Sequence, residues 1–341
     1  MNSKSGMADS GAAVGVARKP RICAAVITFR RPRMLQALLA SFSDLRAPEG
    51  MELSFLVIDN DAQRAAASTV AAFAAQMGQA KVHYVVEGEP GIPFARNRAV
   101  AEAQAMGASY LAFLDDDEAA DSDWLIESTG TLRSRGLELV GGPVRCADWV
   151  EASPPGWWRR LVFEGIRSRY FSKERSASRR FRQGAEGDIV IVTNNWLLDL
   201  AWQKRTGLRF DESLRETGGS DVLFYRMAKK LGIRSGWCET AIVRERVPLS
   251  RASFAYQFDR ARHQSMASFR RNHPTVTASA AAMAIISCLL KGLGCVACIL
   301  ALPFAGGAAL VQLARQSGWA VGRLQALAGR RSSLYSTADG I

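Results

Sequence analysis

The chemistry of this chain is most visible where a short apolar run meets four consecutive acids. Residues 111–114 (LAFL) predict a buried strand, and Asp115, Asp116, Asp117 and Glu118 follow directly. Carboxylates that lie close together repel, and burying them is costly unless water or a cation compensates the charge. Hard divalent cations such as Mg²⁺ or Mn²⁺ prefer oxygen ligands and leave positions open for phosphate. The run predicts a metal–diphosphate site, with a solvated acidic turn as the alternative.

Alternating strands and helices must position these acids. Apolar runs at 21–29, 53–58, 82–86 and 109–114 predict four strands, and helical patterns follow the first three of them. Such alternation favours an α/β fold with a mainly parallel sheet flanked by helices.

Polar residues follow each of the four predicted strands. Thr28 comes after the first, Asp59 after the second, Arg96 after the third and Asp115 after the fourth. The carboxyl ends of neighbouring parallel strands form one crevice. There a carboxylate can accept a hydrogen bond from a base or ribose hydroxyl, and an arginine can pair with phosphate. Together the positions predict a nucleotide-binding crevice.

The second half of the chain is less regular. Residues 137–144 and 189–193 predict strands, whereas residues 196–206 and 220–231 predict helices. Residues 151–187 mix Pro, Trp, Arg and Ser with weak periodicity. We expect a long loop or small insertion there.

The C-terminal region is apolar. Residues 278–313 are nearly all apolar, with Pro303 and two glycines inside. About 20 such residues can span a bilayer, and a re-entrant hairpin or interfacial helices are the alternatives. Arginines follow the run, and residues 1–19 contain no secretory signal pattern. We expect membrane association through residues 276–314, at the cytoplasmic face of the cell membrane.

The net charge of +12 indicates an anionic partner. Nucleic acid, anionic lipid and a nucleotide-phosphate substrate all satisfy this condition. Four acids at a strand end would repel a nucleic-acid backbone, so a basic nucleic-acid-binding protein is the weaker interpretation. No GxGxxG follows the first strand, which disfavours a Rossmann oxidoreductase.

Several segments in order resemble family 2 glycosyltransferases of the GT-A fold. They are AVITFRRPRMLQALLASF, FLVIDND, GIPFARNRAVAEAQAMGASYLAFLDDDE and GLRFDESLRETGGSDVLFYRMAKKLG. The resemblance extends over about residues 21–270. It implies a GT-A (Rossmann-like) domain over residues 20–275, divided into a nucleotide-binding half, 20–120, and an acceptor half, 121–275. An apolar helical region, 276–331, and flexible tails, 1–19 and 332–341, complete the predicted organisation.

The resemblance implies a nucleotide-sugar donor, with a UDP-sugar as the expectation. The donor pocket would be lined by Thr28, Asp59, Arg96, Asp115 and Asp116. Mn²⁺ or Mg²⁺ would be held by Asp117 and Asp115. Arg260 and Arg262 resemble a late basic segment that contacts the diphosphate. Asn194, Asn195 and Trp196 would face the saccharide or lipid-linked acceptor.

Asp221 takes the position of the family's general base. A sugar hydroxyl is a poor nucleophile and needs a carboxylate within hydrogen-bond reach to accept its proton. One base opposite the leaving group gives inversion by single displacement. The resemblance thus implies a metal-dependent inverting hexosyltransferase-type enzyme in polysaccharide or glycolipid biosynthesis. A cytosolic protein O-glycosyltransferase is the alternative within this class.

Two departures from the family pattern stand out. Ser220 occupies a position where the family often has an acid, and the run before Val247 and Pro248 lacks a His that many relatives place there. Glu245 is a candidate substitute for that metal ligand. These departures leave open a catalytically inactive GT-A-like scaffold of a membrane assembly complex.

Overall fold

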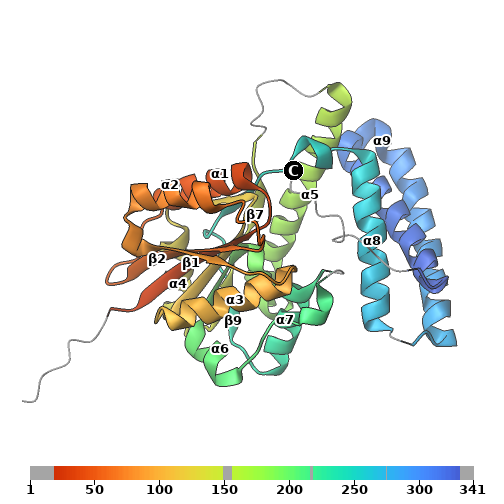
Figure 1. Ribbon diagram of the computed structural model, residues 1–341. Helices are drawn as coiled ribbons and strands as arrows, with labels where there is room; N and C mark the ends of the chain where they lie inside the picture. The colour runs from red at the N-terminus through yellow and green to blue at the C-terminus, as the bar shows by residue number, and fades with distance from the viewer. Residues whose placement is uncertain (1–18, 149–155, 216–217, 274, 331–341) are drawn as a thin grey trace, which may run out of the picture.

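A seven-stranded mixed sheet lies at the centre of the fold (Figure 1). The computed structural model describes residues 19–148, 156–215, 218–273 and 275–330. The strand order is β3-β2-β1-β4-β8-β6-β9. The bounds are β1 Arg21–Thr28, β2 Glu52–Asp59, β3 Val82–Val86, β4 Tyr110–Asp115, β6 Leu139–Gly141, β8 Trp196–Asp199 and β9 Ser235–Trp237. The predicted tails, 1–19 and 332–341, lie outside the described residues except for Lys19.

The register brings the strand ends together. Strand β1 lies between β2 and β4 and is parallel to both, with Thr28 opposite Asp59 and Ile27 opposite Asp115. Strand β8 is antiparallel to both β4 and β6. The predicted mainly parallel sheet is confirmed, and its first strands end at one edge.

Helices cover both faces of this sheet. The apolar side chains of α1 Pro32–Ser43, α2 Ala67–Met77 and α4 Trp124–Ser134 pack in one core cluster. Those of α3 Ile92–Ala105, α6 Leu200–Thr206 and α7 Ser220–Lys230 pack in the other. In α1 the predicted helical spacing is confirmed, because Leu35, Leu38, Leu39 and Phe42 are its buried residues.

A second, three-stranded sheet borders the first. Its order is β5-β10-β7, with bounds β5 Glu118–Ala120, β10 Val243–Glu245 and β7 Val144–Cys146. Strand β10 is antiparallel to β5, which sets Glu245 opposite Glu118. Short 3₁₀ turns occur at η1 Gln79–Lys81, η2 Glu186–Asp188, η3 Thr193–Asn195, η4 Glu212–Leu214 and η5 Leu249–Arg251.

The predicted loop at 151–187 is wrong over most of its length. Residues 157–182 form a 26-residue helix, α5 Trp157–Arg182, while residues 151–155 lie outside the described parts of the chain. Few of the helix residues are buried, among them Val162, Phe163 and Ile166, so its amphipathic pattern is weak. Tertiary packing against the C-terminal helix explains its stability better than its own periodicity does.

Strand boundaries in the second half also differ from those predicted. Residues 137–144 divide into β6 and β7, which join different sheets, because Pro143 between them cannot continue a ladder. Residues 189–193 form no strand. Residues 196–199, predicted as helix, are instead β8, and the helix α6 begins at Leu200.

The C-terminal region is a helical hairpin. Helix α8, Phe254–Asn272, precedes α9, Ala278–Leu327, which bends at Gly306 where φ is 46° and ψ is −120°. A residue without a side chain adopts that conformation without steric cost. We call residues 278–305 the first arm and residues 307–327 the second arm. The arms run antiparallel, with Lys291 lying 5.7 Å from the ring centroid of Trp319.

The first arm exposes one apolar face. Its outward side chains include Met283, Ile286, Leu289, Leu290, Leu293, Val296, Leu300 and Phe304. The apolar window of α9 has a mean hydropathy of 2.3, and 6% of it is buried. The expected apolar helical segment is confirmed as a feature of the fold.

Candidate active site

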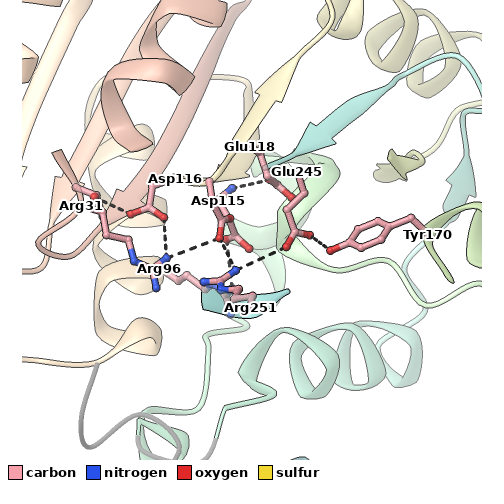
Figure 2. A network of polar contacts seen from close by, with 10 residues as sticks. Arg31, Arg96, Asp115, Asp116, Glu118, Tyr170, Glu245 and Arg251 are labelled. Atoms are coloured by element: carbon pink, nitrogen blue, oxygen red, sulfur yellow. Dashed lines mark hydrogen bonds and ion pairs between the residues drawn. The ribbon is translucent and has the colours of Figure 1, made fainter. Parts of the chain in front are cut away.

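Four acids connect β4 to β5 and form what we call the acid cluster. Its members are Asp115, Asp116, Asp117 and Glu118. Glu245 of β10 lies beside Asp115 and Glu118 (Figure 2). Asp116 is 6% exposed, Asp117 7% and Glu118 1%. Three of the four carboxylates at the predicted acidic strand end are thus buried, while the Asp115 side chain is 38% exposed, and a fully solvated turn is not what the structure has.

Asp116 joins the ends of two strands. Its Oδ2 accepts a hydrogen bond of 2.8 Å from the Thr28 hydroxyl, and its Oδ1 accepts one of 3.2 Å from Arg31. Burial raises the pKa of Asp116 to about 6, although the Arg31 guanidinium opposes the shift. The predicted pair Thr28 and Asp116 is therefore brought together.

Asp115 lies between acids and one arginine. Its backbone N–H donates to Glu118 Oε2 at 2.8 Å, and its carboxylate lies 3.8 Å from Arg96. Burial raises the pKa of Asp115 to about 7 against the opposing charge of Arg96, and neighbouring carboxylates add to the rise. Burial also raises the pKa of Glu118 well above its ordinary value. The cluster holds more negative charge than its surroundings compensate.

Asp117 and Glu245 share an arginine. Arg251 donates to Asp117 Oδ2 at 2.9 Å and lies 3.8 Å from Glu245 Oε1 (Figure 2). The Tyr170 hydroxyl donates to Glu245 Oε2 at 2.5 Å. Burial raises the pKa of Glu245, and the charge of Asp117 adds to this effect. Glu245, the expected substitute for a missing His, therefore lies next to the acid cluster.

Arg96 connects the acid cluster to the start of α7. This guanidinium is 6% exposed, donates to Ser220 Oγ at 3.0 Å and lies 5.6 Å from the Phe210 ring centroid. Asp221 follows in the first turn of α7, where a negative charge is favoured by the helix dipole. Its charge contributes to the raised pKa of Asp115. Arg96, Asp115 and Asp221 thus belong to one site.

Asp59 is buried at the end of β2. It is fully buried and accepts hydrogen bonds from Asp61 N at 3.1 Å, Ala66 N at 2.9 Å and the Tyr84 hydroxyl at 2.7 Å. These bonds fix the segment after β2. The Asp59 carboxylate is enclosed by these donors in this arrangement, and its contact with a base stays a prediction.

Two of the three expected acceptor residues, Asn195 and Trp196, are buried. Asn195 accepts from Trp124 Nε1 at 2.9 Å and donates to the carbonyls of Pro143 and Ala241 at 3.0 and 2.8 Å. Trp196 is 1% exposed in an aromatic core with Phe113, Phe210 and Phe224. Neither side chain can touch a sugar in this arrangement. Asn194 is half-buried and remains a candidate.

The two arginines expected at the diphosphate, Arg260 and Arg262, have different neighbours. Arg262 pairs with Asp259 of its own helix at 2.9 Å and does not join the acid cluster. Arg260 lies near Glu245 and Arg251, whose charges influence its pKa. Only Arg260 is therefore placed for contact with an anionic ligand beside the acids.

Three residues of the site were missed by sequence reasoning. Arg31 directly follows a predicted strand end, so the rule that found Thr28 also identifies it. Tyr170 and Arg251 come from α5 and η5, for which the sequence carries no periodic or motif signal. Tyr170 reaches Glu245 and Arg251 reaches Asp117 through side-chain hydrogen bonds.

Comparison with known proteins shows the family of the chain. Residues 23–197 match the model of glycosyl transferase family 2. The succinoglycan biosynthesis protein ExoM of Rhizobium meliloti (strain 1021) is 32% identical over 232 residues, covering 68% of each protein.

Solved structures share the fold at low sequence identity. The mannosyltransferase PcManGT from Pyrobaculum calidifontis, in complex with GDP-Man and Mn²⁺, has a TM-score of 0.58 at 17% identity, covering 92% of this chain and 89% of that one. S. aureus TarS 1–349 in complex with UDP-GlcNAc has a TM-score of 0.50 at 12% identity, covering 91% and 92%. The match to the family model, together with the relative at 32% identity, shows that the chain belongs to glycosyltransferase family 2, and its fold is GT-A.

Proposed function

We propose that this protein is an inverting glycosyltransferase that moves a sugar from a nucleotide-diphosphate donor to a lipid-linked saccharide in polysaccharide or glycolipid biosynthesis. The observation that carries the proposal is the placement of Asp221 beside a buried acid cluster, with Arg96 between them. The name of the relative ExoM, a succinoglycan biosynthesis protein, supports the polysaccharide context.

Asp221 is the proposed general base. It accepts the proton of the acceptor hydroxyl as that oxygen bonds to the anomeric carbon of the donor sugar. The bond from this carbon to the diphosphate breaks, and the nucleoside diphosphate leaves with the bonding electrons. Because attack comes from the face opposite the leaving group, the anomeric configuration inverts.

The donor pocket is proposed along the ends of β1 and β4. Thr28 and Arg31 hold Asp116 there, and Arg96 brings positive charge to Asp115. These bonds orient the carboxylates before a donor binds, which lowers the cost of ordering them during the reaction. A UDP-sugar and a GDP-sugar are both candidate donors.

The acid cluster fits a hard divalent cation. Three of its four carboxylates are buried and several have raised pKa values, so added positive charge would stabilise them. In the described parts of the chain no three acidic, His or Cys side chains converge as a ready-made site. Asp117 and Asp115 are the proposed holders, with open positions for water and diphosphate. Bound Mn²⁺ or Mg²⁺ would neutralise charge on the leaving diphosphate.

The first arm of α9 is the proposed membrane contact. Its exposed apolar face suits the interfacial region of a bilayer. Helix α8 packs against both arms through Met266 and Phe269, and α8 also carries Arg262 and Arg270. A spanning arm would draw these charges into hydrocarbon, at high cost. We therefore propose an arm that lies in the interface, at the cytoplasmic face.

A donor panel tests the proposal. Detergent-extracted protein is incubated with UDP-sugars and GDP-sugars, Mn²⁺ or Mg²⁺, and membrane lipid extract, and release of nucleoside diphosphate is followed. Release with one donor, lost in EDTA, supports the proposal. Donor binding without release in any mixture would favour the inactive scaffold, and salt-sensitive nucleic-acid binding in EDTA would favour the basic binder.

A further inference from the structure

Four basic side chains from three helices gather around Tyr170. Arg169 and Lys173 come from α5, Arg260 from α8 and Arg315 from the second arm of α9. The charges of Arg169 and Arg260 both act on Lys173 and on Arg315. We call these four side chains the basic cluster.

Specific contacts fix this cluster in place. Arg315 donates to the Gln257 Oε1 of α8 at 3.4 Å, which ties the second arm to α8. Lys173 Nζ lies 5.7 Å from the ring centroid of Tyr170, whose hydroxyl donates to Glu245. The basic cluster therefore borders the acid cluster, with Tyr170 and Glu245 as the boundary.

The positive charge of the cluster is compensated in part by Glu245. Across the described ranges, Arg169, Lys173 and Arg260 have no carboxylate at ion-pairing distance. The charge of Glu245 acts on all three, and Glu245 also lies 3.8 Å from Arg251. Partial burial and the neighbouring cations Arg169 and Arg260 lower the pKa of Arg315 to about 10, whereas Lys173 is exposed. Keeping such groups together is costly unless an anion binds among them, and guanidinium groups suit phosphate oxygens.

The contact between α5 and the second arm is apolar near Gly165 and Gly307. Further along both helices in chain direction it is lined by basic residues. Gly165 and Gly307 allow close approach, since a Cβ on Gly165 would lie 2.0 Å from the Gly307 carbonyl oxygen. Next to them, Val162, Ile166, Leu310 and Val311 form a small apolar core. About one helical turn further lie Arg169 and Arg315, which belong to the basic cluster.

Exposed aromatic residues mark the other end of this contact. Trp157 and Trp158 at the start of α5 are 76% and 45% exposed, and Phe304 just before the bend of α9 is 92% exposed. Indole rings favour the membrane–water interface. From this end inward the molecule offers a lipid-facing surface, then the basic cluster, then the acid cluster.

We propose that the basic cluster binds the phosphate or diphosphate that joins lipid to saccharide in the acceptor. The order of surfaces matches the order of groups in such a molecule: lipid, phosphate, sugar. This inference rests on the proposed function. It assigns Arg260 to the acceptor phosphate rather than to the diphosphate of the donor.

Binding of farnesyl diphosphate in EDTA tests the inference, because EDTA removes metal-mediated binding at the acid cluster. The variants are Arg169→Gln with Arg315→Gln, the same pair changed to Lys, and Arg175→Gln. Arg175 is exposed on the same helix and serves as the matched control. Farnesol and phosphatidylglycerol vesicles are the comparison ligands. Binding of UDP and GDP with Mn²⁺ checks that each variant is folded.

We expect the double Gln variant to bind farnesyl diphosphate about 10-fold or more weakly, with the Lys pair and Arg175→Gln close to wild type. Equal binding by the double Gln variant would overturn the inference. So would equal affinity of the wild type for farnesol, or a loss confined to phosphatidylglycerol vesicles. If the double variant does not fold, Arg169→Gln and Arg315→Gln are judged singly by the same ligands.

The two proposals fail separately. Binding needs no sugar transfer, so a protein that transfers no sugar can still show the phosphate site. Conversely, transfer to a lipid-linked acceptor with an unchanged KM in the double Gln variant would contradict the phosphate site and leave the proposed function intact.

Discussion

Arg96 donates from Nη1 to Ser220 Oγ at 3.0 Å, while its Nη2 lies 3.8 Å from Asp115. The family often has an acid at the position of Ser220. A neutral hydroxyl there accepts the hydrogen bond without neutralising Arg96. The guanidinium therefore keeps its charge for Asp115 and for an anionic donor.

Replacing Ser220 tests whether a neutral residue there leaves the charge of Arg96 for Asp115 and the donor. In Ser220→Asp the new carboxylate should pair with Arg96, weaken its effect on Asp115 and raise the pKa of Asp115 further. We expect kcat at neutral pH to fall about 10-fold and to recover partly at higher pH. Ser220→Ala is the matched control and should change kcat less than about 3-fold. Identical pH–rate profiles for Ser220→Asp and the wild type would contradict this account.

Substitutions of the neighbouring Asn194 and Asn195 should have different effects, one on acceptor binding and the other on stability. Asn195→Ala leaves a buried indole N–H and two carbonyls without partners, so we expect a loss of about 2–3 kcal/mol of unfolding free energy. Trp196→Ala empties an aromatic core and should cost about 3–5 kcal/mol. Asn194→Ala should leave stability unchanged and raise the acceptor KM. Denaturant unfolding measures the change in stability, and steady-state kinetics measure the acceptor KM. If Asn194→Ala destabilises the protein, the result would count against Asn194 as an acceptor-binding residue.

The metal-free protein should lose stability as pH rises. The pKa of Asp116 is raised from 3.8 to about 6, so the folded state holds this proton more tightly than the unfolded state. That contribution is complete below about pH 4 and is lost as pH rises through 6. In EDTA we expect the unfolding midpoint to fall between pH 5 and 7.5, with a shallower fall in Asp116→Asn. Saturating Mn²⁺ should remove this fall of the unfolding midpoint with pH. A midpoint that rises with pH in EDTA would contradict the prediction.

The apolar face of the first arm should control membrane binding. Leu293 and Leu300 are 68% and 70% exposed, and inserting each into lipid gains about 1.5–3 kcal/mol. Changing both to Gln should weaken vesicle binding by about 100-fold or more. Leu231→Gln, at an equally apolar exposed position in the catalytic domain, should have no effect. Unchanged co-sedimentation of the Leu293/Leu300 variant with vesicles would contradict the proposed contact.

The sequence predicted the nucleotide-binding half well because its signals are local. Each apolar run ends at a polar residue, and parallel pairing brings those ends together, as with Thr28 and Asp59. The same rule could not tell which side chains face the crevice. Asp59 is enclosed by its own loop, and only the structure reveals this.

The second half depended on packing that no local pattern reports. Strand β8 pairs with β4 so that Trp196 lies opposite Phe113, and this register places the indole in the core. Helix α5 is rich in arginine and buries few residues, so its periodicity is faint. Its partner is the second arm of α9, more than 120 residues later in the chain. The sites that depend on α5, including Tyr170, therefore could not be predicted.

The variant Asp221→Asn tests whether Asp221 is the general base of an inverting sugar transfer. Wild type, Asp221→Asn and the exposed control Asp211→Asn are compared with the donor identified by the panel, for sugar transfer, nucleoside diphosphate binding and product anomer. The account predicts an inverted product, transfer reduced at least about 100-fold in Asp221→Asn alone, and binding within about 3-fold of wild type. Undiminished transfer by Asp221→Asn, or a product that retains the donor's anomeric configuration, would contradict it.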